Sequence, residues 1–378
     1  MKIGLGLYRH LLTPDNFTFA KQLGVEQIVV HLENYLADEV THKVALSRGG
    51  SDGGGEAVDG YWTYDTFREL IDGLAEYDLK LAAIENFAVK QRSDILLAGP
   101  RRDAQLEQMK KMLRAAGRAG VPCFGYNFSI AGVWGWERGP FARGGAMSVG
   151  FDASTIDINE PIPDGIVWNM RYRRGKPGAS IPPVSEEEIW SRVAYFLNAI
   201  LPVAKEAGVK LAAHPDDPPM DTLRGTARLV NEPHKYDRLI EINASRSNTV
   251  ELCLGSLQEM RNGDIYDVVD QYSRGNRIGY IHFRNVTGKV PNYREVFLDE
   301  GDIDMARIMR ILKINAFDGV LIPDHTPEVH CNAPWHAGMA YAIGYARALS
   351  KCLIGEAHDV GTHRKSVPQR SGRICLLE

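Results

Sequence analysis

The sequence of 378 residues predicts an α/β protein, a (β/α)8 barrel of the TIM type. Short apolar runs alternate with longer segments of helical periodicity over most of the chain, which is typical of repeated βα units. No glycine-rich phosphate turn follows the first apolar run, which disfavours a doubly wound open sheet. Barrels of this length often form one domain. We therefore expect a single barrel domain at residues 1–355 and a polar, extended tail at residues 356–378.

Eight short apolar runs are expected to form the barrel strands, at residues 2–8, 27–32, 80–86, 121–128, 209–214, 249–253, 277–283 and 319–324. Segments with helical periodicity lie between them, at residues 13–24, 64–77, 101–119, 185–207, 234–243, 302–313 and 336–350. Ser185 followed by Glu186–Glu188 is typical of a helix start, because a hydroxyl and nearby carboxylates satisfy the free N–H groups there.

Two segments have the composition of loops. The insert at 41–60 is rich in Gly and Ser. The stretch at 129–183 contains many Gly, Pro and Trp residues, and we expect it to be an irregular βα-loop insertion. Because βα connections lie on the catalytic face of a barrel, this second segment is expected to form a lid or a substrate wall.

Charge and composition exclude several classes of protein. The formal net charge is −4 and no basic block is present, so no nucleic-acid partner is expected. No apolar run approaches the length of about 18 residues that a membrane span needs, and the N-terminus lacks the pattern of a signal peptide. The five cysteines form no disulfide framework, so we expect reduced thiols and a cytoplasmic location.

Four potential metal ligands lie at the carboxyl ends of four successive expected strands: His214, Cys253, His282 and Asp324. Each residue alone has an ordinary structural explanation, as a core histidine, a buried thiol or a helix cap. In a barrel, however, these strand ends converge on one mouth. Two imidazoles, a thiolate and a carboxylate suit Mn, Fe, Co or Zn rather than Ca or Mg. The sequence therefore predicts one divalent transition metal at the barrel mouth.

Residues next to these ligands are candidates for catalysis. His325 follows Asp324 and is expected to act as a general acid or base, with a supporting loop histidine as the alternative. Arg284 could clamp a substrate carboxylate through two hydrogen bonds, or form a surface ion pair instead. Asp216 could orient His214 or bind substrate hydroxyls, or it could stabilise a proline-flanked turn.

Three further residues are candidates for binding a sugar. Glu85 and Asn127 close the third and fourth expected strands, where polar side chains can hold hydroxyl groups. Trp134 could cover the apolar face of a sugar or pack within the lid. These residues favour a small polyhydroxylated substrate.

Several motifs together resemble the mannonate dehydratase family of xylose-isomerase-like, metal-dependent barrels. They are LYRH at 7–10, AAIEN at 82–86, GYNFSIAGVWGW at 125–136, AAHPDDPP at 212–219, ELCLGSL at 251–257, IHFRNV at 281–286, LDEGDIDM at 298–305 and PDHTP at 323–327. The resemblance covers about residues 1–350. It implies the metal ligands His214, Cys253, His282 and Asp324, the catalytic residue His325, and Mn²⁺ or Fe²⁺ as the metal. The implied reaction is the loss of water from D-mannonate, which yields 2-keto-3-deoxy-D-gluconate.

The sequence departs from the family pattern at the eighth expected strand. The family carries Arg before PDH and Gly after it, whereas this chain has Ile322 and Thr326. The family's catalytic Tyr in a PGY stretch is also missing, and His330, Trp335 and His336 are the candidates for its place. An isomerase or epimerase of a related sugar or sugar acid therefore stays open as the alternative function. A catalytically silent barrel is a third class. We expect a small-molecule sugar acid as the ligand and a homo-oligomeric assembly.

Overall fold

Eight parallel strands close a barrel in the computed structural model, which describes residues 1–33, 55–56 and 60–362. In chain order the barrel strands are β1 (Lys2–Tyr8), β2 (Gln27–His31), β4 (Lys80–Glu85), β5 (Cys123–Tyr126), β10 (Lys210–Ala213), β13 (Asn248–Cys253), β14 (Ile278–His282) and β17 (Val320–Ile322). Each pairs with the next in chain order, and β17 pairs with β1. The predicted barrel and its eight strands are confirmed. The insert predicted at 41–60 lies almost entirely outside the described residues.

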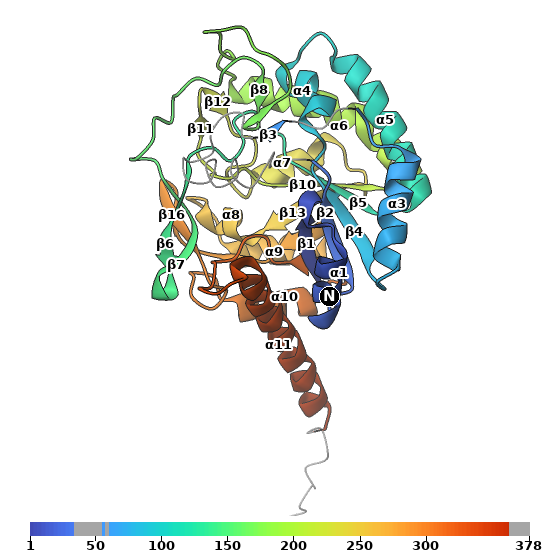
Figure 1. Ribbon diagram of the computed structural model, residues 1–378, viewed down its shortest axis with the longest axis vertical. Helices are drawn as coiled ribbons and strands as arrows, with labels where there is room; N and C mark the ends of the chain where they lie inside the picture. The colour runs from blue at the N-terminus through green and yellow to red at the C-terminus, as the bar shows by residue number, and fades with distance from the viewer. Residues whose placement is uncertain (34–54, 57–59, 363–378) are drawn as a thin grey trace, which may run out of the picture.

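Helices surround the barrel and follow its strands (Figure 1). The seven expected helices are present as α1 (Pro14–Gln22), α3 (Tyr64–Ala75), α5 (Arg102–Ala119), α6 (Glu186–Ala207), α7 (Lys235–Ile242), α10 (Met305–Ile314) and α11 (Pro334–Thr362). Ser185 caps α6, where its hydroxyl accepts the N–H of Glu188 while the Glu188 carboxylate accepts the N–H of Ser185.

Three described helices were not expected: α4 (Val89–Leu97), α8 (Leu254–Glu259) and α9 (Ile265–Arg274). Helix α8 has only six residues and starts directly after Cys253, which is too short for periodicity to reveal. Helix α11 projects away from the barrel and continues to Thr362, so residues 356–362 are helical rather than extended (Figure 1). Residues 363–378 lie outside the described residues, and the division into one barrel domain and a tail stays a prediction.

The insertion at 129–183 is not irregular, which corrects the expectation. It contains β6 (Trp136–Ala142), η2 (Arg143–Gly145), β7 (Ala146–Asp152), β8 (Ile166–Val167) and β9 (Met170–Arg171). Strand β7 pairs with β16 (Asn292–Val296), which pairs with β15 (Asn285–Lys289), so β15-β16-β7-β6 form an antiparallel sheet beside the barrel (Figure 1). The pairing of Arg294 with Gly150 joins distant parts of the sequence. Local periodicity cannot report such long-range pairing.

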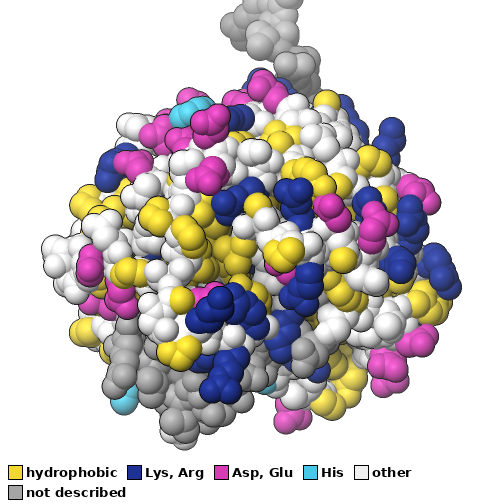
Figure 2. Space-filling model, turned by 90° about the horizontal axis from the view of Figure 1, so that it is seen from above, with side chains coloured by type: hydrophobic (Ala, Val, Ile, Leu, Met, Phe, Trp, Pro, Cys, Tyr) yellow, Lys and Arg dark blue, Asp and Glu magenta, His cyan; other side chains and the backbone are white. Residues whose placement is uncertain are grey.

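The remaining short elements are η1 (Arg9–Leu11), β3 (Gly55–Glu56), β11 (Thr222–Leu223) and β12 (Thr226–Ala227). On the face shown in Figure 2, basic side chains gather near the middle beside hydrophobic ones, while acidic side chains lie mostly toward the edge. Among the described helices, none is both long enough and apolar enough to span a bilayer.

The barrel interior contains a separate hydrophobic cluster, distinct from the main core between strands and helices. It consists of Val29, Ala83, Cys123, Ala212, Tyr280, Val320 and Ile322. Side chains alternate between the two faces of a strand, so every second residue along each barrel strand points inward. This alternation decides which side chains reach the mouth.

Candidate metal centre

The inward-facing residue at the carboxyl end of each barrel strand is polar. Continuing the alternation by two residues from the interior cluster leads to His31, Glu85, His214, His282 and Asp324. On the other three strands the same alternation leads to Tyr8, Asn127 and Cys253. Strand pairing places Tyr8 beside His31 and Cys253 beside His282. All of these residues except Cys253 line one cavity of about 540 Å³, and Cys253 is fully buried. The mouth of the barrel is therefore the candidate site.

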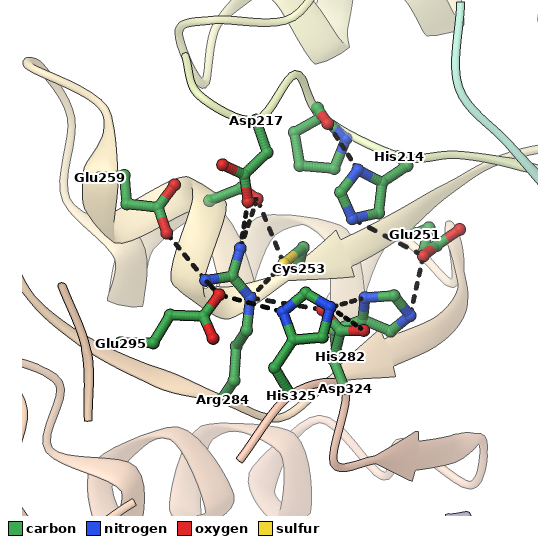
Figure 3. A network of polar contacts seen from close by, with 12 residues as sticks. His214, Asp217, Glu251, Cys253, Glu259, His282, Arg284, Glu295, Asp324 and His325 are labelled. Atoms are coloured by element: carbon green, nitrogen blue, oxygen red, sulfur yellow. Dashed lines mark hydrogen bonds and ion pairs between the residues drawn. The ribbon is translucent and has the colours of Figure 1, made fainter. Parts of the chain in front are cut away.

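The structure brings three of the four predicted metal ligands into one group. One donor atom from each of His214, Cys253 and His282 lies within 4.8 Å of the other two. Asp324 is outside that group, but its Oδ2 is 3.2 Å from Nδ1 of His282 (Figure 3). The Nδ1 atom of His214 is 2.5 Å from the carbonyl oxygen of Pro215, so Nδ1 carries a proton. Burial lowers the pKa of His214, but Glu251 and Cys253 outweigh burial and raise it to about 10. The donor set is two nitrogens, one sulfur and one carboxylate.

Arg284 sets the charge state of Cys253. Its Nε lies 3.3 Å from the sulfur, and the Ser256 hydroxyl lies 3.2 Å from it. Burial opposes ionisation, but Arg284 and the hydrogen bonds from His214 and His282 hold the pKa of Cys253 well below its usual range. These neighbours favour the thiolate, the form that binds metals.

The opposite edge of the His282 ring faces two buried carboxylates. Its Nε2 is 3.1 Å from Oε2 of Glu85 and 3.0 Å from Oε1 of Glu251. Glu251 also accepts a hydrogen bond of 2.6 Å from the Tyr280 hydroxyl. Burial, and secondly repulsion from Glu85, raise the pKa of Glu251. Glu85, Glu251 and His282 form a second group of potential ligands, and the two carboxylates also hold the imidazole with Nδ1 toward Asp324.

His325 lies at the cavity wall, as the sequence predicts. Its Nδ1 is 3.0 Å from Oε1 of Glu295, and its Nε2 is 3.5 Å from Oδ1 of Asp324 (Figure 3). Its ring stands edge-on to Trp136 at 5.2 Å. Burial lowers the pKa of His325, but Asp324 and Glu295 outweigh burial and raise it to about 9.

Two predicted substrate contacts do not fit the structure. The guanidinium of Arg284 is buried and bonded to Asp217, to Glu259 at 2.8 Å and to Glu295 at 3.0 Å, and Arg284 does not line the cavity. A side chain so engaged has no donor left for a substrate, because three buried carboxylates already take its N–H groups. Trp134 packs in the core under the guanidinium of Arg224, and Trp136 lines the cavity in its place.

Three other predicted contacts line the cavity, but their polar atoms are already used. Asp216 accepts the backbone N–H groups of Leu229 and Val230 at 2.7 and 2.8 Å. Asn127 donates to Asn86 at 2.7 Å. Glu85 faces His282, as described above. These residues shape the wall and leave fewer free polar atoms for a ligand than their types suggest.

Sequence reasoning missed Tyr8, His31, Glu251, Glu259 and Glu295. Glu251 could have been found, because it lies two residues before Cys253 on one strand and therefore on the same inward face. His31 ends an expected strand and could have been found in the same way. Glu259 and Glu295 reach Arg284 from a helix and a sheet that periodicity did not indicate.

The chain is similar to known proteins over most of its length. The model of the family "D-mannonate dehydratase (UxuA)" matches residues 54–356. The mannonate dehydratases of Streptococcus suis (strain 05ZYH33) and Streptococcus pneumoniae (strain 70585) are 30% and 31% identical, each over 82% of this chain and 89% of the relative. The crystal structure of mannonate dehydratase from Streptococcus suis serotype2 matches with a TM-score of 0.73 at 26% identity, covering 94% of this chain and 96% of that chain.

Sugar epimerases share only the fold with this chain. A structure of L-ribulose 3-epimerase matches with a TM-score of 0.55 at 14% identity, over 96% of this chain and 100% of that one. The similarity to the dehydratases therefore supports the predicted dehydratase over the isomerase or epimerase alternative. On the family match and the two relatives, the chain belongs to the D-mannonate dehydratase family.

Proposed function

We propose that this protein is a hydro-lyase that converts D-mannonate to 2-keto-3-deoxy-D-gluconate and water with a divalent transition metal at the barrel mouth. One observation carries the proposal: His214, Cys253 and His282 share a common centre, with Asp324 beside them and His325 next in the chain. Four ligands from four neighbouring strands suit a site that keeps positions open for a substrate.

The side chains fit Mn²⁺ or Fe²⁺, with Zn²⁺ or Co²⁺ as further candidates. The low pKa of Cys253 favours the thiolate that a metal requires, and with Nδ1 of His214 on the Pro215 carbonyl oxygen, Nε2 is the nitrogen that would bind the metal in place of a proton. Glu85 and Glu251 hold His282 from behind. A bound cation would supply Lewis-acid stabilisation of the negative charge that develops on substrate oxygens.

His325 is proposed to transfer a proton. Dehydration removes the hydrogen on C2, breaks the C3–O bond and delivers a proton to the departing hydroxyl group, which leaves as water. The enol that remains tautomerises to the 2-keto acid. Glu295 holds Nδ1 of His325, so Nε2, which lies 3.5 Å from Oδ1 of Asp324, is the atom that would exchange a proton at the cavity side. Trp136 packs edge-on against the ring of His325 and lines the same cavity.

His336 is proposed as the second proton-transfer group, in place of the tyrosine that the family carries. Of the three candidates from the sequence, Trp335 and His336 line the main cavity, whereas His330 lines a smaller one. Nε2 of His336 is 2.9 Å from Oδ1 of Asn16, which leaves Nδ1 as its free nitrogen. Tyr341 does not line the cavity; its hydroxyl interacts with Asp299 and Arg143.

The test is a product assay of the protein loaded separately with Mn²⁺ and Fe²⁺ and offered a panel of aldonates. A 2-keto-3-deoxy acid detected with semicarbazide supports the proposal, and retention of all hydroxyl groups in an epimerised product overturns it. Metal content after loading, measured on the wild type and on Cys253→Ser, tests the ligand set.

We further propose that the protein acts in the cytoplasm, where the four described cysteines, all free, stay reduced. A homo-oligomer stays a prediction.

A further inference from the structure

The cavity needs a cation for the substrate carboxylate, and Arg284 cannot supply it. Acidic groups surround the candidate metal centre, and each is already paired: Asp217 and Glu295 with Arg284, and Asp324 with His282. A carboxylate approaching this region meets like charge wherever a metal does not hold it. Among the described residues, two arginines line the cavity, Arg138 and Arg228.

Arg228 is a buried guanidinium held rigidly from two sides. Its side chain is 1% exposed, and its Nε lies 3.3 Å from Oδ1 of Asp216. Nη1 donates to the hydroxyl of Ser129 at 2.7 Å and to the carbonyl oxygen of Gly132 at 3.0 Å. The loops after β5 and β10 therefore fix the same group, which removes most of the entropy that a flexible arginine would lose on binding.

The third nitrogen of Arg228 is uncommitted. No hydrogen bond joins Nη2 to any group in the described part of the chain. Nε lies 3.3 Å from Oδ1 of Asp216 without forming a hydrogen bond, so only Nη1 is hydrogen-bonded. Arg228 lines the same cavity as His214, Asp324 and His325. Asp216 neutralises the guanidinium only in part, because its Oδ2 is taken by two backbone N–H groups. Because Arg228 is buried and lines the cavity, an N–H donor of its guanidinium that lacks an acceptor is costly unless a ligand supplies one.

We propose that Arg228 binds the carboxylate of the sugar acid, with Nη2 donating to the carboxylate oxygens. This proposal rests on the proposed function and names the residue that selects an acid over a neutral sugar. A charge-assisted hydrogen bond at this point also stabilises the negative charge that builds on the carboxylate as the C2 proton leaves. Asp216, which the sequence assigned to substrate binding, acts instead as the positioning residue for Arg228.

Arg138 is the matched alternative and fits less well. Its Nη2 forms an ion pair of 2.7 Å with Glu328, and both side chains are partly exposed. Because water screens an exposed ion pair, Arg138 is expected to contribute little to the binding of a substrate carboxylate.

The test compares the binding of D-mannonate and D-mannitol to the metal-loaded protein by calorimetry, with His325→Ala in every sample so that D-mannonate is not turned over. The two ligands share their hydroxyl pattern, and D-mannitol lacks the carboxylate. The preference for D-mannonate over D-mannitol is measured as the ratio of their dissociation constants. In Arg228→Gln this preference is expected to fall by about 10- to 100-fold, the usual effect of removing a hydrogen bond to a charged group. Arg228→Lys keeps a cation beside Asp216 and is expected to lie between Arg228→Gln and the wild type.

An unchanged ratio in Arg228→Gln and Arg228→Lys overturns the inference, including the case in which both ligands bind more weakly, which would mean that Arg228 only supports the loops. Arg138→Gln is the control and is expected to keep the wild-type ratio. Loss of the ratio in Arg138→Gln instead of Arg228→Gln also overturns it. Wild-type protein that binds D-mannonate without forming product would overturn the proposed function but not the carboxylate site.

Discussion

Replacing Gly125 by alanine is expected to disturb the proposed metal site through Tyr280 and Glu251. A Cβ atom at this position would lie 2.0 Å from the Tyr280 hydroxyl oxygen and 2.6 Å from Oε2 of Glu251, whereas ordinary contact begins at 3.4 Å. The hydroxyl would have to retreat by about 1.4 Å, which breaks its 2.6 Å hydrogen bond to Glu251. Glu251 would then lose its hold on Nε2 of His282.

Two effects of Gly125→Ala follow, and their sizes can be set in advance. Overpacking costs about 1–3 kcal/mol and the lost hydrogen bond to a carboxylate about 1.5–3 kcal/mol, while the less flexible alanine recovers about 0.5–1 kcal/mol. The free energy of unfolding should therefore fall by about 2–5 kcal/mol. Loss of the group that orients a histidine ligand should weaken metal binding by about 10- to 100-fold.

Denaturant unfolding and chelator competition measure the two effects of Gly125→Ala. Gly73→Ala in helix α3 is the control, because a Cβ atom there meets nothing within 4 Å and should leave metal affinity unchanged. Adding Tyr280→Phe to Gly125→Ala removes the closest clashing atom and should recover part of the packing cost but none of the metal affinity. Wild-type metal affinity in Gly125→Ala would refute the reasoning that Glu251 orients His282.

Four further substitutions test other parts of the structure. His325→Ala should retain metal, measured by elemental analysis, and lose about 10²- to 10⁴-fold in kcat, the usual contribution of a proton-transfer group; normal turnover would remove His325 from the mechanism. His336→Ala should lower kcat with little change in the Kd of D-mannonate, and an unaltered kcat would exclude His336 as the second group. Arg284→Gln leaves buried carboxylates without a cation and should cost about 3–5 kcal/mol in denaturant unfolding. Ser185→Ala should cost about 1 kcal/mol in the same assay with normal activity, because only the helix cap is lost.

The barrel could be predicted from the sequence because each strand and helix has its own local periodicity. The four proposed metal ligands could be predicted for a related reason: parallel strands in a barrel all end at one mouth, so residues at the ends of neighbouring strands, such as His282 and Asp324, had to lie near each other once the strands were placed. Their convergence needed no knowledge of loop structure. The family resemblance added the chemistry, and the family match supports it.

The roles of Arg284 and Trp134 could not be predicted in this way. The position of Arg284 after a strand gave no hint that Glu259 and Glu295 would enclose its guanidinium, because they come from a short helix and from an inserted sheet. Trp134 and Trp136 are two residues apart in a segment without periodicity, and only packing decided that Trp136 faces the cavity.

The sequence by itself determined the strands, most of the helices and which residues the barrel presents at its mouth, because these depend on patterns within about 20 residues. Tertiary structure alone decided which charges pair, and so which of them remain available to a ligand. Ion pairing depends on side chains that arrive from distant segments and compete for the same donors. The N–H groups of Arg284 are all taken by protein partners, whereas Nη2 of Arg228 has no hydrogen-bond partner among the described residues.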